Sequence, residues 1–188
     1  VLLRPENESD TERAQQAVAD VRQFLQEIEP GCNIAVKRVM TESLSDTVQD
    51  CCHTLSEAAT DGECIVLLCG GARDILLPLT ISSLVYARRI DSTLFFSDLD
   101  NRVAEWDLPN LTATIPDRAL ETFESLVEAE DWMSLSDIAA ETGQSKSTVI
   151  RHVNDLEDAG VVASDSSEKA KQVRITFSGE LLFLSKGI

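Results

Sequence analysis

Two short windows of the sequence hold basic side chains with no acidic residue among them. The windows are residues 143–154 and 169–177, whereas the 188-residue chain as a whole has a formal net charge of −17. Their basic residues are Lys146, Arg151, Lys169, Lys171 and Arg174. Lysine and arginine contact phosphates, and the planar guanidinium of arginine can also bind the edge of a guanine through two hydrogen bonds. The two windows therefore predict contact with a nucleic acid.

The first window has the pattern of a helix with two different faces. Apolar residues recur at i, i+4 and i+7 and form a stripe for a core. These residues are Val149, Val153 and Leu156. On the opposite face lie Ser147, Arg151 and Asn154. We expect Arg151 to bind guanine and Asn154 to bind adenine.

The start of this helix suits phosphate groups. Ser145 is the expected N-cap, and Lys146 and Thr148 lie in the first turn. Backbone N–H groups at a helix N-terminus attract anions. Ser145 and Lys146 are therefore candidates for contacts with the DNA backbone, which fix the position of a recognition helix without reading the sequence.

The neighbouring elements predict a winged helix-turn-helix over residues 115–188. The predicted helices are 117–129, one that opens on the capping-box-like Ser134–Asp137 and ends at Thr142–Gly143, and 145–159. Two strands, 161–164 and 172–177, enclose a polar turn and would form the wing. The alternative is a helix-turn-helix that serves protein contacts alone, in which case the two basic windows are coincidental.

This half resembles the winged helix-turn-helix of prokaryotic transcription regulators of the MarR/ArsR type. The similar stretches are LSDIAAETGQSKSTVIRHVNDLEDAGVV and ITFSGELLFL, and the resemblance covers residues 117–184. It implies binding to double-stranded DNA, usually as a homodimer on a two-fold site.

A second group of residues, Gly70-Gly71-Ala72-Arg73, could hold an anion. It follows the apolar stretch Cys64–Cys69, which has the composition of a strand covered on both faces, and it precedes an apolar helix that runs to about Arg89. Glycines allow close approach of a ligand, and the helix N-terminus and Arg73 favour negative charge. The spacing matches neither a dinucleotide fingerprint nor a P-loop. The alternative is a tight turn with a solvated arginine.

The first 114 residues alternate strand and helix, which predicts an α/β domain with a parallel, Rossmann-like sheet. The predicted strands are 1–3, 34–39, 64–69 and 92–97, with helices at 10–28 and 45–60 and a turn at 98–101 leading into 102–106. The opening Val-Leu-Leu has the character of a strand that lacks its neighbour. We expect that a first strand and helix of the domain are absent from this sequence.

The combination of this domain, its Gly-Gly-x-Arg and a following winged helix resembles the CARF (CRISPR-associated Rossmann fold) regulators of archaea. The resemblance implies a homodimer that binds cyclic oligoadenylate, typically the tetra-adenylate, through Gly70, Gly71, Ala72 and Arg73. Residues at other strand ends are expected to line the same pocket; they are Arg4, Pro5, Glu6, Met40 and Thr41. No residue has the placement of a general base, so no enzyme activity is predicted. Alternatives are a sensor of another phosphorylated metabolite and a slow ring nuclease.

Composition limits the remaining classes of protein. None of the five cysteines forms a C-x-x-C pair and the two histidines lie far apart, so we expect no zinc site and no resident cofactor. The cysteines are typical of reduced core thiols in a cytoplasmic protein. Acidic residues are spread over the whole chain, which favours adaptation to high salt, as in a haloarchaeal protein, over a surface that simply repels nucleic acid.

Overall fold

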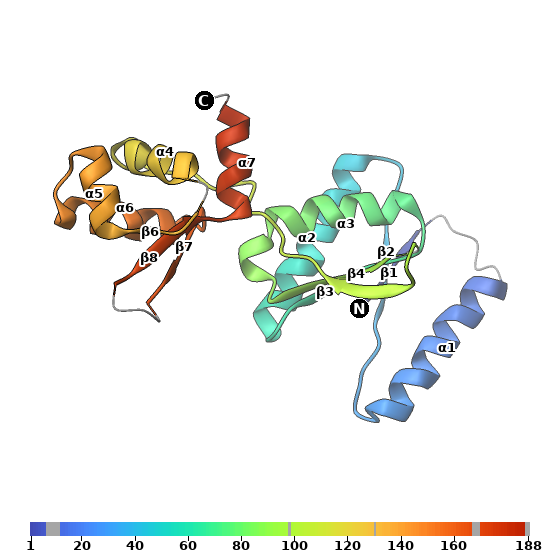
Figure 1. Ribbon diagram of the computed structural model, residues 1–188. Coiled ribbons are helices and arrows are strands. Elements are labelled where there is room, and N and C mark those ends of the chain that lie inside the picture. Colours follow the sequence, from blue (N-terminus) through green and yellow to red (C-terminus); the bar gives the residue numbers. More distant parts are fainter. Residues whose placement is uncertain (7–11, 98, 130, 167–169, 187–188) are drawn as a thin grey trace. The chain divides into compact units, whose positions relative to one another are not determined.

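The computed structural model describes residues 1–6, 12–97, 99–129, 131–166 and 170–186 (Figure 1). The chain divides into two compact units, residues 1–107 and 108–188. The division precedes the predicted one at 114/115 because the intervening segment packs into the second unit. Ala113 lies in the core of that unit, and the backbone N–H of Asn110 donates to Ser178 Oγ at 3.0 Å.

The first unit is a mixed α/β structure. Its elements are β1 (Leu2–Pro5), α1 (Glu12–Ile28), β2 (Val36–Val39), α2 (Leu44–Asp61), β3 (Ile65–Leu68), α3 (Arg73–Val85), a 3₁₀ turn η1 (Ala87–Arg89), β4 (Ser92–Ser97) and β5 (Arg102–Glu105). β1 pairs with β2 in parallel, and β3 pairs with β4 in parallel. These pairs belong to two separate sheets, ordered β1-β2 and β3-β4-β5. Figure 1 shows α2 and α3 on one side of the strands and α1 on the other.

Local sequence signals explain the helices of this unit. The hydroxyl of Ser43 caps α2 by accepting from the backbone N–H of Asp46 at 3.4 Å. The core helices α2 and α3 pack together, and Ser82 Oγ of α3 donates to the carbonyl of Val48 at 3.0 Å. α3 ends at Val85, before the predicted end near Arg89, and η1 continues the chain. Pro78 lies within α3.

Two predictions for the sheet are wrong. β5 pairs with β4 as an antiparallel hairpin, so the sheet is not parallel throughout. The predicted burial of β3 on both faces is also wrong, because its residues alternate. Ile65 is 57% exposed and Leu67 is 53% exposed, whereas Val66 and Leu68 are buried. One face of β3 is therefore apolar but exposed.

The second unit has three main helices and a small sheet. Its elements are a 3₁₀ turn η2 (Asp117–Ala119), α4 (Leu120–Ala129), β6 (Met133–Ser134), α5 (Leu135–Thr142), α6 (Lys146–Asp158), β7 (Val162–Asp165), β8 (Gln172–Ile175) and α7 (Phe177–Lys186). The sheet is antiparallel, in the order β6-β8-β7. The β7–β8 hairpin confirms the predicted wing strands. Phe177, predicted as the end of a strand, instead opens α7, and the helix predicted over 117–129 begins as the 3₁₀ turn.

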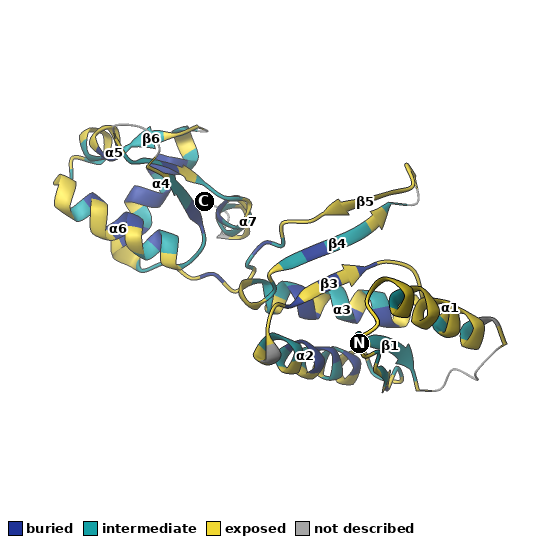
Figure 2. Cartoon of the chain, turned by 90° about the horizontal axis from the view of Figure 1, so that it is seen from below, coloured by how far each residue is buried: buried dark blue, intermediate teal, exposed yellow. Residues whose placement is uncertain are grey.

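One core joins these elements. Its fully buried side chains come from α4, α5, α6 and the sheet, and they include Phe123, Leu126, Ile138, Val149, Val153, Leu156, Val161 and Val173. Figure 2 shows this core as the dark blue inner surface of α4, α6 and the neighbouring strands. None of the helices among the described residues is long and apolar enough to cross a membrane.

Candidate nucleic-acid interface and anion site

The helix-turn-helix is built from two capped helices and one left-handed residue. Ser134 Oγ caps α5 by accepting from the backbone N–H of Asp137 at 3.2 Å. Gly143 ends α5 with φ of 66°, a conformation that favours glycine. Ser145 Oγ then caps α6 by accepting from the backbone N–H of Thr148 at 3.2 Å. These caps fix where α6 begins, and therefore which of its side chains face solvent.

The two faces of α6 are separated as predicted. The three residues of the predicted core stripe, Val149, Val153 and Leu156, are fully buried. On the outer face Ser145, Lys146, Ser147, Arg151 and Asn154 are exposed and Thr148 is half-buried. Among the described residues, none forms a hydrogen bond or ion pair with the side chains of Arg151 or Asn154. Both side chains are therefore available to an external partner.

Hydroxyl groups cluster at the start of α6. Ser145 Oγ lies 2.9 Å from Ser147 Oγ and 2.8 Å from Thr148 Oγ1. Lys146 Nζ donates to Ser136 Oγ at 3.3 Å, which holds its ammonium close to the turn between the two helices. Together with the backbone N–H groups that precede Thr148 in the first turn, this cluster has the chemistry of a phosphate-binding site.

Two acidic residues of α6 are neutralised by basic partners. Arg118, in η2, forms a bidentate ion pair with Asp155, with distances of 2.9 Å (Nη2–Oδ2), 3.0 Å (Nη2–Oδ1) and 3.1 Å (Nε–Oδ2). Lys171 Nζ lies 2.7 Å from Glu157 Oε2, and Ser164 Oγ donates to the other oxygen of Glu157. These two ion pairs offset the negative charges of Asp155 and Glu157 on α6.

Lys171 therefore has a partner within the protein, which differs from its predicted role as a phosphate contact. Partial burial raises the pKa of Glu157, but the hydrogen bonds from Lys171 and Ser164 and the charge of Lys171 outweigh burial and hold the pKa below its ordinary value. The pair joins the wing to α6. Lys169, the other predicted lysine of the wing, lies outside the described residues.

Arg174 is exposed on β8 and stacks on an aromatic ring. Its guanidinium carbon lies 4.7 Å from the centroid of Trp132, a residue that the sequence analysis did not single out. The contact orients the guanidinium while leaving its edge in solvent. The signal for Trp132 was weak in the sequence, because the residue precedes a strand of only two residues.

His152 is a buried residue of α6 that the sequence analysis also did not single out. Its side chain is buried, and Nδ1 lies 3.0 Å from Thr122 Oγ1 of α4. Because Thr122 Oγ1 donates to Gln144 Oε1 at 3.3 Å, it accepts from His152 Nδ1–H. Burial, and next the charge of Arg151, lower the pKa of His152, so the buried ring favours its neutral form.

Comparison with known proteins decides the type of the second unit. The family model of the IclR helix-turn-helix domain matches residues 116–166. The second unit is an IclR-type DNA-binding domain. The match is thus to the IclR type and not to the MarR/ArsR type that the sequence resembles, and it makes the chain a DNA-binding transcriptional regulator of that helix-turn-helix type.

Other comparisons add little to the IclR-type assignment. A solved fragment of a possible transcriptional regulatory protein from Mycobacterium bovis is 20% identical, with a TM-score of 0.34. That match covers 38% of this chain and 77% of the other. No curated protein matches the chain.

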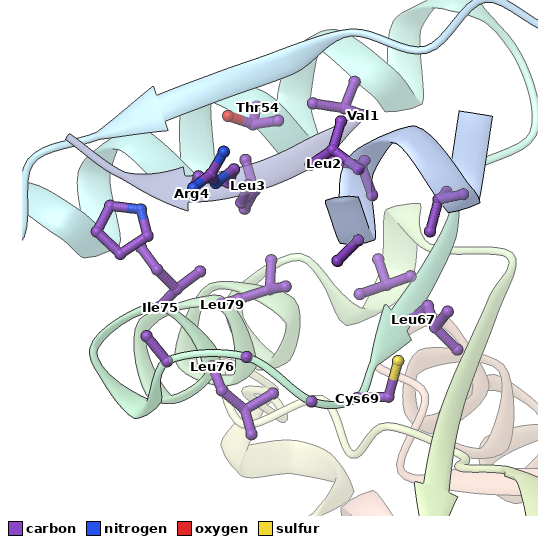
Figure 3. A pocket seen from close by; sticks show the side chains of 18 of the residues that line it. Val1, Leu2, Leu3, Arg4, Thr54, Leu67, Cys69, Ile75, Leu76 and Leu79 are labelled. Carbon is purple, nitrogen blue, oxygen red and sulfur yellow. The ribbon is translucent and has the colours of Figure 1, made fainter. Parts of the chain in front are cut away.

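The first unit contains a cavity of about 550 Å³ that brings together part of the predicted anion site. Five of the nine predicted residues line it, namely Arg4, Pro5, Gly70, Gly71 and Ala72. Figure 3 shows Arg4 at the wall formed by β1, on the same side as Ile75 of α3. Arg73, Thr41, Met40 and Glu6 are not among the lining residues. Most of the remaining wall is apolar.

The turn between β3 and α3 has the predicted conformation of a strand-to-helix loop. Gly70 has φ of 56° and Gly71 has φ of 81°, and a Cβ on either would meet no atom within 4 Å. The N-cap, Ala72, offers no side-chain hydrogen bond, so the first N–H groups of α3 lack the cap that α2, α5 and α6 possess. Arg73 is exposed beside them. Asp74, also in the first turn, opposes this positive charge.

Two cysteines of the first unit, Cys51 and Cys64, are buried. Burial raises the pKa of Cys51 to about 11, and burial together with Asp91 raises the pKa of Cys64. Thiols with raised pKa values are poor nucleophiles and poor metal ligands at neutral pH. Within the described part of the chain, no three His, Cys, Asp or Glu side chains are grouped so that they could hold a metal ion.

Proposed function

We propose that the chain is an effector-responsive transcription regulator. The second unit binds operator DNA through α6 and the β7–β8 wing, and the first unit is a Rossmann-like, CARF-like sensor of an anionic ligand. The observation that carries the DNA-binding half is the division of α6 into a buried apolar stripe and an exposed face with Arg151 and Asn154.

We assign the contacts on α6 by the chemistry of each side chain. Arg151 offers two parallel donors to guanine, and Asn154 offers a donor and an acceptor to adenine. Ser145, Lys146, Ser147 and Thr148 bind backbone phosphates at the helix start. Arg151 and Asn154 would therefore determine which DNA sequence is bound, and the residues at the helix start would determine the overall affinity for DNA.

Arg174 and Lys169 of the wing add phosphate contacts. Lys171 contributes indirectly, because its ion pair with Glu157 holds the wing against α6. Removal of Arg174 should therefore weaken binding to all DNA sequences alike, whereas removal of Lys171 should first lower the stability of the domain.

An operator selected from random duplexes tests this assignment. The Arg151→Ala protein should bind the selected operator with a cost of about 1–3 kcal/mol and should lose its preference at one base pair. Arg88→Ala is the matched control, because Arg88 is an exposed arginine of the first unit. Unchanged base preference in Arg151→Ala would remove that residue from the recognition face. Binding that persists in molar KCl would support an acidic surface adapted to salt.

The sensor half of the proposal is supported by the β3–α3 turn. Two left-handed glycines, an uncapped helix N-terminus and Arg4 meet at one cavity, as an anionic ligand requires. The proposed effector is cyclic oligoadenylate, in particular the tetra-adenylate, bound between two copies of the chain. Leu77, Ile81 and Val85 form an exposed apolar stripe along α3, which suits the contact of a homodimer.

Calorimetry in high KCl tests the effector. Cyclic tetra-adenylate should bind at one molecule per dimer, and Arg73→Ala should abolish binding while Arg88→Ala leaves it unchanged. Binding of a different nucleotide in place of the cyclic one would favour a metabolite sensor without a CRISPR link. Loss of the cyclic nucleotide on incubation, abolished by Arg73→Ala, would indicate a ring nuclease.

The coupling between the two halves has its own test. Effector should change operator affinity by about 1–3 kcal/mol if it favours one of two dimer states. Equal affinity with and without a bound effector would contradict the coupling while leaving the DNA-binding assignment intact.

A further inference from the structure

Arg118 is a cation that lies outside the two basic windows and is nevertheless bound to α6. Its neighbours in the sequence include the acidic residues Asp117 and Glu121. Its ion pair is instead with Asp155 of α6, 37 positions further along the chain. The packing of η2 against α6 therefore brings this arginine to the helix that is proposed to bind DNA.

The position of Asp155 places the guanidinium beside the exposed face of α6. Asp155 lies four residues after Arg151, and residues four apart occupy the same face of a helix, one turn along. The side chain of Asp155 is 23% exposed, whereas that of Arg118 is 55% exposed. The more exposed member of the pair is thus the cation, and it is the group that this part of the face presents to a partner.

The ion pair uses one edge of the guanidinium and leaves a second edge. Nε and Nη2 of Arg118 donate to the carboxylate oxygens of Asp155 at distances of 2.9, 3.0 and 3.1 Å. Within the described residues, Nη1 has no hydrogen-bond partner. The two N–H groups of Nη1 and the second N–H of Nη2 therefore form an edge that matches two oxygens of a phosphate. The carboxylate also fixes the plane of the guanidinium, which lowers the entropic cost of binding.

The distance along α6 matches the width of a DNA groove. The proposed phosphate contacts at the helix start begin at Ser145, and Asp155 lies ten residues further along (155 − 145). A rise of 1.5 Å per residue separates the two positions by about 15 Å. The major groove is about 12 Å wide, so phosphates on its two sides are a similar distance apart. A helix that crosses the groove would reach one backbone from its start and the other from Arg118.

We propose that Arg118 is a further contact to the DNA backbone, which Asp155 of α6 holds in position to bind a phosphate. The proposal rests on the proposed DNA-binding function and adds a contact that neither basic window contains. In the alternative role, Arg118 only neutralises Asp155, whose negative charge would otherwise repel phosphates. The two roles differ in what is expected once Asp155 has been replaced as well.

The dependence of DNA affinity on salt tests the contact, because it reports the number of phosphates that a protein neutralises. The selected operator and an unrelated duplex of equal length are titrated between about 0.1 and about 1 M KCl. Loss of one phosphate contact lowers the slope of log K against log[salt] by about 0.9. Arg118→Met should show this change on both duplexes, with an affinity loss of about eightfold at 0.1 M that disappears near 1 M. Base preference should be retained, in contrast to Arg151→Ala, and Arg88→Met in the first unit should have no effect.

Replacement of Asp155 separates direct contact from neutralisation. Asp155→Asn keeps the arginine and should retain the wild-type slope. The double variant Arg118→Met/Asp155→Asn carries neither charge. It should have the same lowered slope as Arg118→Met, because the phosphate contact is lost in both. A double variant that binds both duplexes as the wild type does would mean that Arg118 only neutralises Asp155, and the proposed contact would be wrong.

Ethylation interference on the operator gives a readout that a loss of stability does not imitate. Ethylation of the phosphate bound by Arg118 should weaken binding of the wild type and of Asp155→Asn, and should not affect Arg118→Met. Lys146→Met should instead lose interference at a phosphate on the other side of the groove. Identical interference patterns for the wild type and Arg118→Met would overturn the proposal.

The wild-type protein distinguishes failure of this contact from failure of the proposed function. If the wild type binds DNA and Arg118→Met has the same slope, the DNA-binding function stands and the contact of Arg118 is wrong. If the wild type binds neither duplex at any salt concentration, the DNA-binding function is itself wrong, and the contact is wrong with it.

Discussion

The two units of this chain differ in how completely they close around their own cores. Of the twelve largest fully buried side chains among the described residues, nine lie in residues 108–188 and three in residues 1–107, although the second unit is the shorter one. Figure 2 shows the same contrast, with α1 exposed along most of its length and α4 and α6 buried on one face. The second unit therefore encloses its apolar core with its own elements, whereas part of the apolar surface of the first unit is exposed.

The difference has a physical origin in the range of the contacts. In the second unit, neighbouring helices in the sequence pack on each other and a hairpin closes the core, so most contacts are local. In the first unit, the nearest ends of β1 and β3, Pro5 and Ile65, are 60 positions apart in the sequence (65 − 5), and the two strands belong to separate sheets.

The largest expected effect compares two phenylalanines. Phe123→Ala should cost the second unit about 3–5 kcal/mol, because Phe123 is fully buried and its removal leaves a cavity. Phe24→Ala should change the stability of the first unit by no more than about 0.5 kcal/mol, because Phe24 is 60% exposed on α1. Urea unfolding followed by hydrogen exchange in each unit measures both. A large cost for Phe24→Ala would mean that α1 is covered in solution and would remove the contrast.

A smaller effect is expected from two lysine–glutamate pairs. Lys171→Met should lower the stability of the second unit by about 1–3 kcal/mol, since Lys171 and Glu157 are each only 28% exposed and lie 2.7 Å apart. Lys37→Met should cost less than about 1 kcal/mol, because its 3.3 Å pair with Glu57 is more exposed.

The pH dependence of the Lys171 pair follows from the lowered pKa of Glu157. Its contribution should be complete above the ordinary value of 4.5 and should be lost as the pH falls through the lower folded-state pKa. Denaturant titrations of Lys171→Met and wild type at several pH values measure this difference. A difference between the two proteins that does not shrink in acid would mean that packing of the lysine stem, and not the ion pair, stabilises the wing.

The smallest effect is expected from the buried histidine of the second unit. Because the folded-state pKa of His152 is lowered, stability should be complete above pH 6.5 and should decrease as the pH falls through 6.5 towards the folded-state pKa. One histidine contributes a slope of at most about 1.4 kcal/mol per pH unit. His152→Gln should therefore flatten the pH dependence of the stability of the second unit between pH 7 and 5.5. An unchanged slope in His152→Gln would assign the pH dependence to other groups.

The sequence predicted the second unit well because its signals are local. Ser145, Gly143 and the stripe of Val149, Val153 and Leu156 each act within a few residues, and the structure confirms all of them. Lys171 shows the limit of such reasoning. Its charge was visible in the sequence, but its partner Glu157 lies on another element, and only the folded hairpin brings them together.

In the first unit the sequence predicted elements but not their assembly. The boundaries of β4 agree with the prediction. The apolar composition of β3 correctly predicted a strand but wrongly predicted burial on both faces, because composition does not say which elements will cover each face of a strand. Leu67 is exposed. The antiparallel β5 was missed because direction is set by pairing across the sheet and not by the residues of the strand.

The anchoring of the segment that joins the two units has a mechanical consequence. Asn110 Nδ2 donates to the carbonyl of Ala159, just past the end of α6, at 3.3 Å, while its backbone N–H donates to Ser178 in α7. These two bonds make the linker part of the second unit from Asn110 onward. In mechanical terms, the joint between the units is confined to the residues that precede Asn110, and the end of α6 is where the linker is fastened.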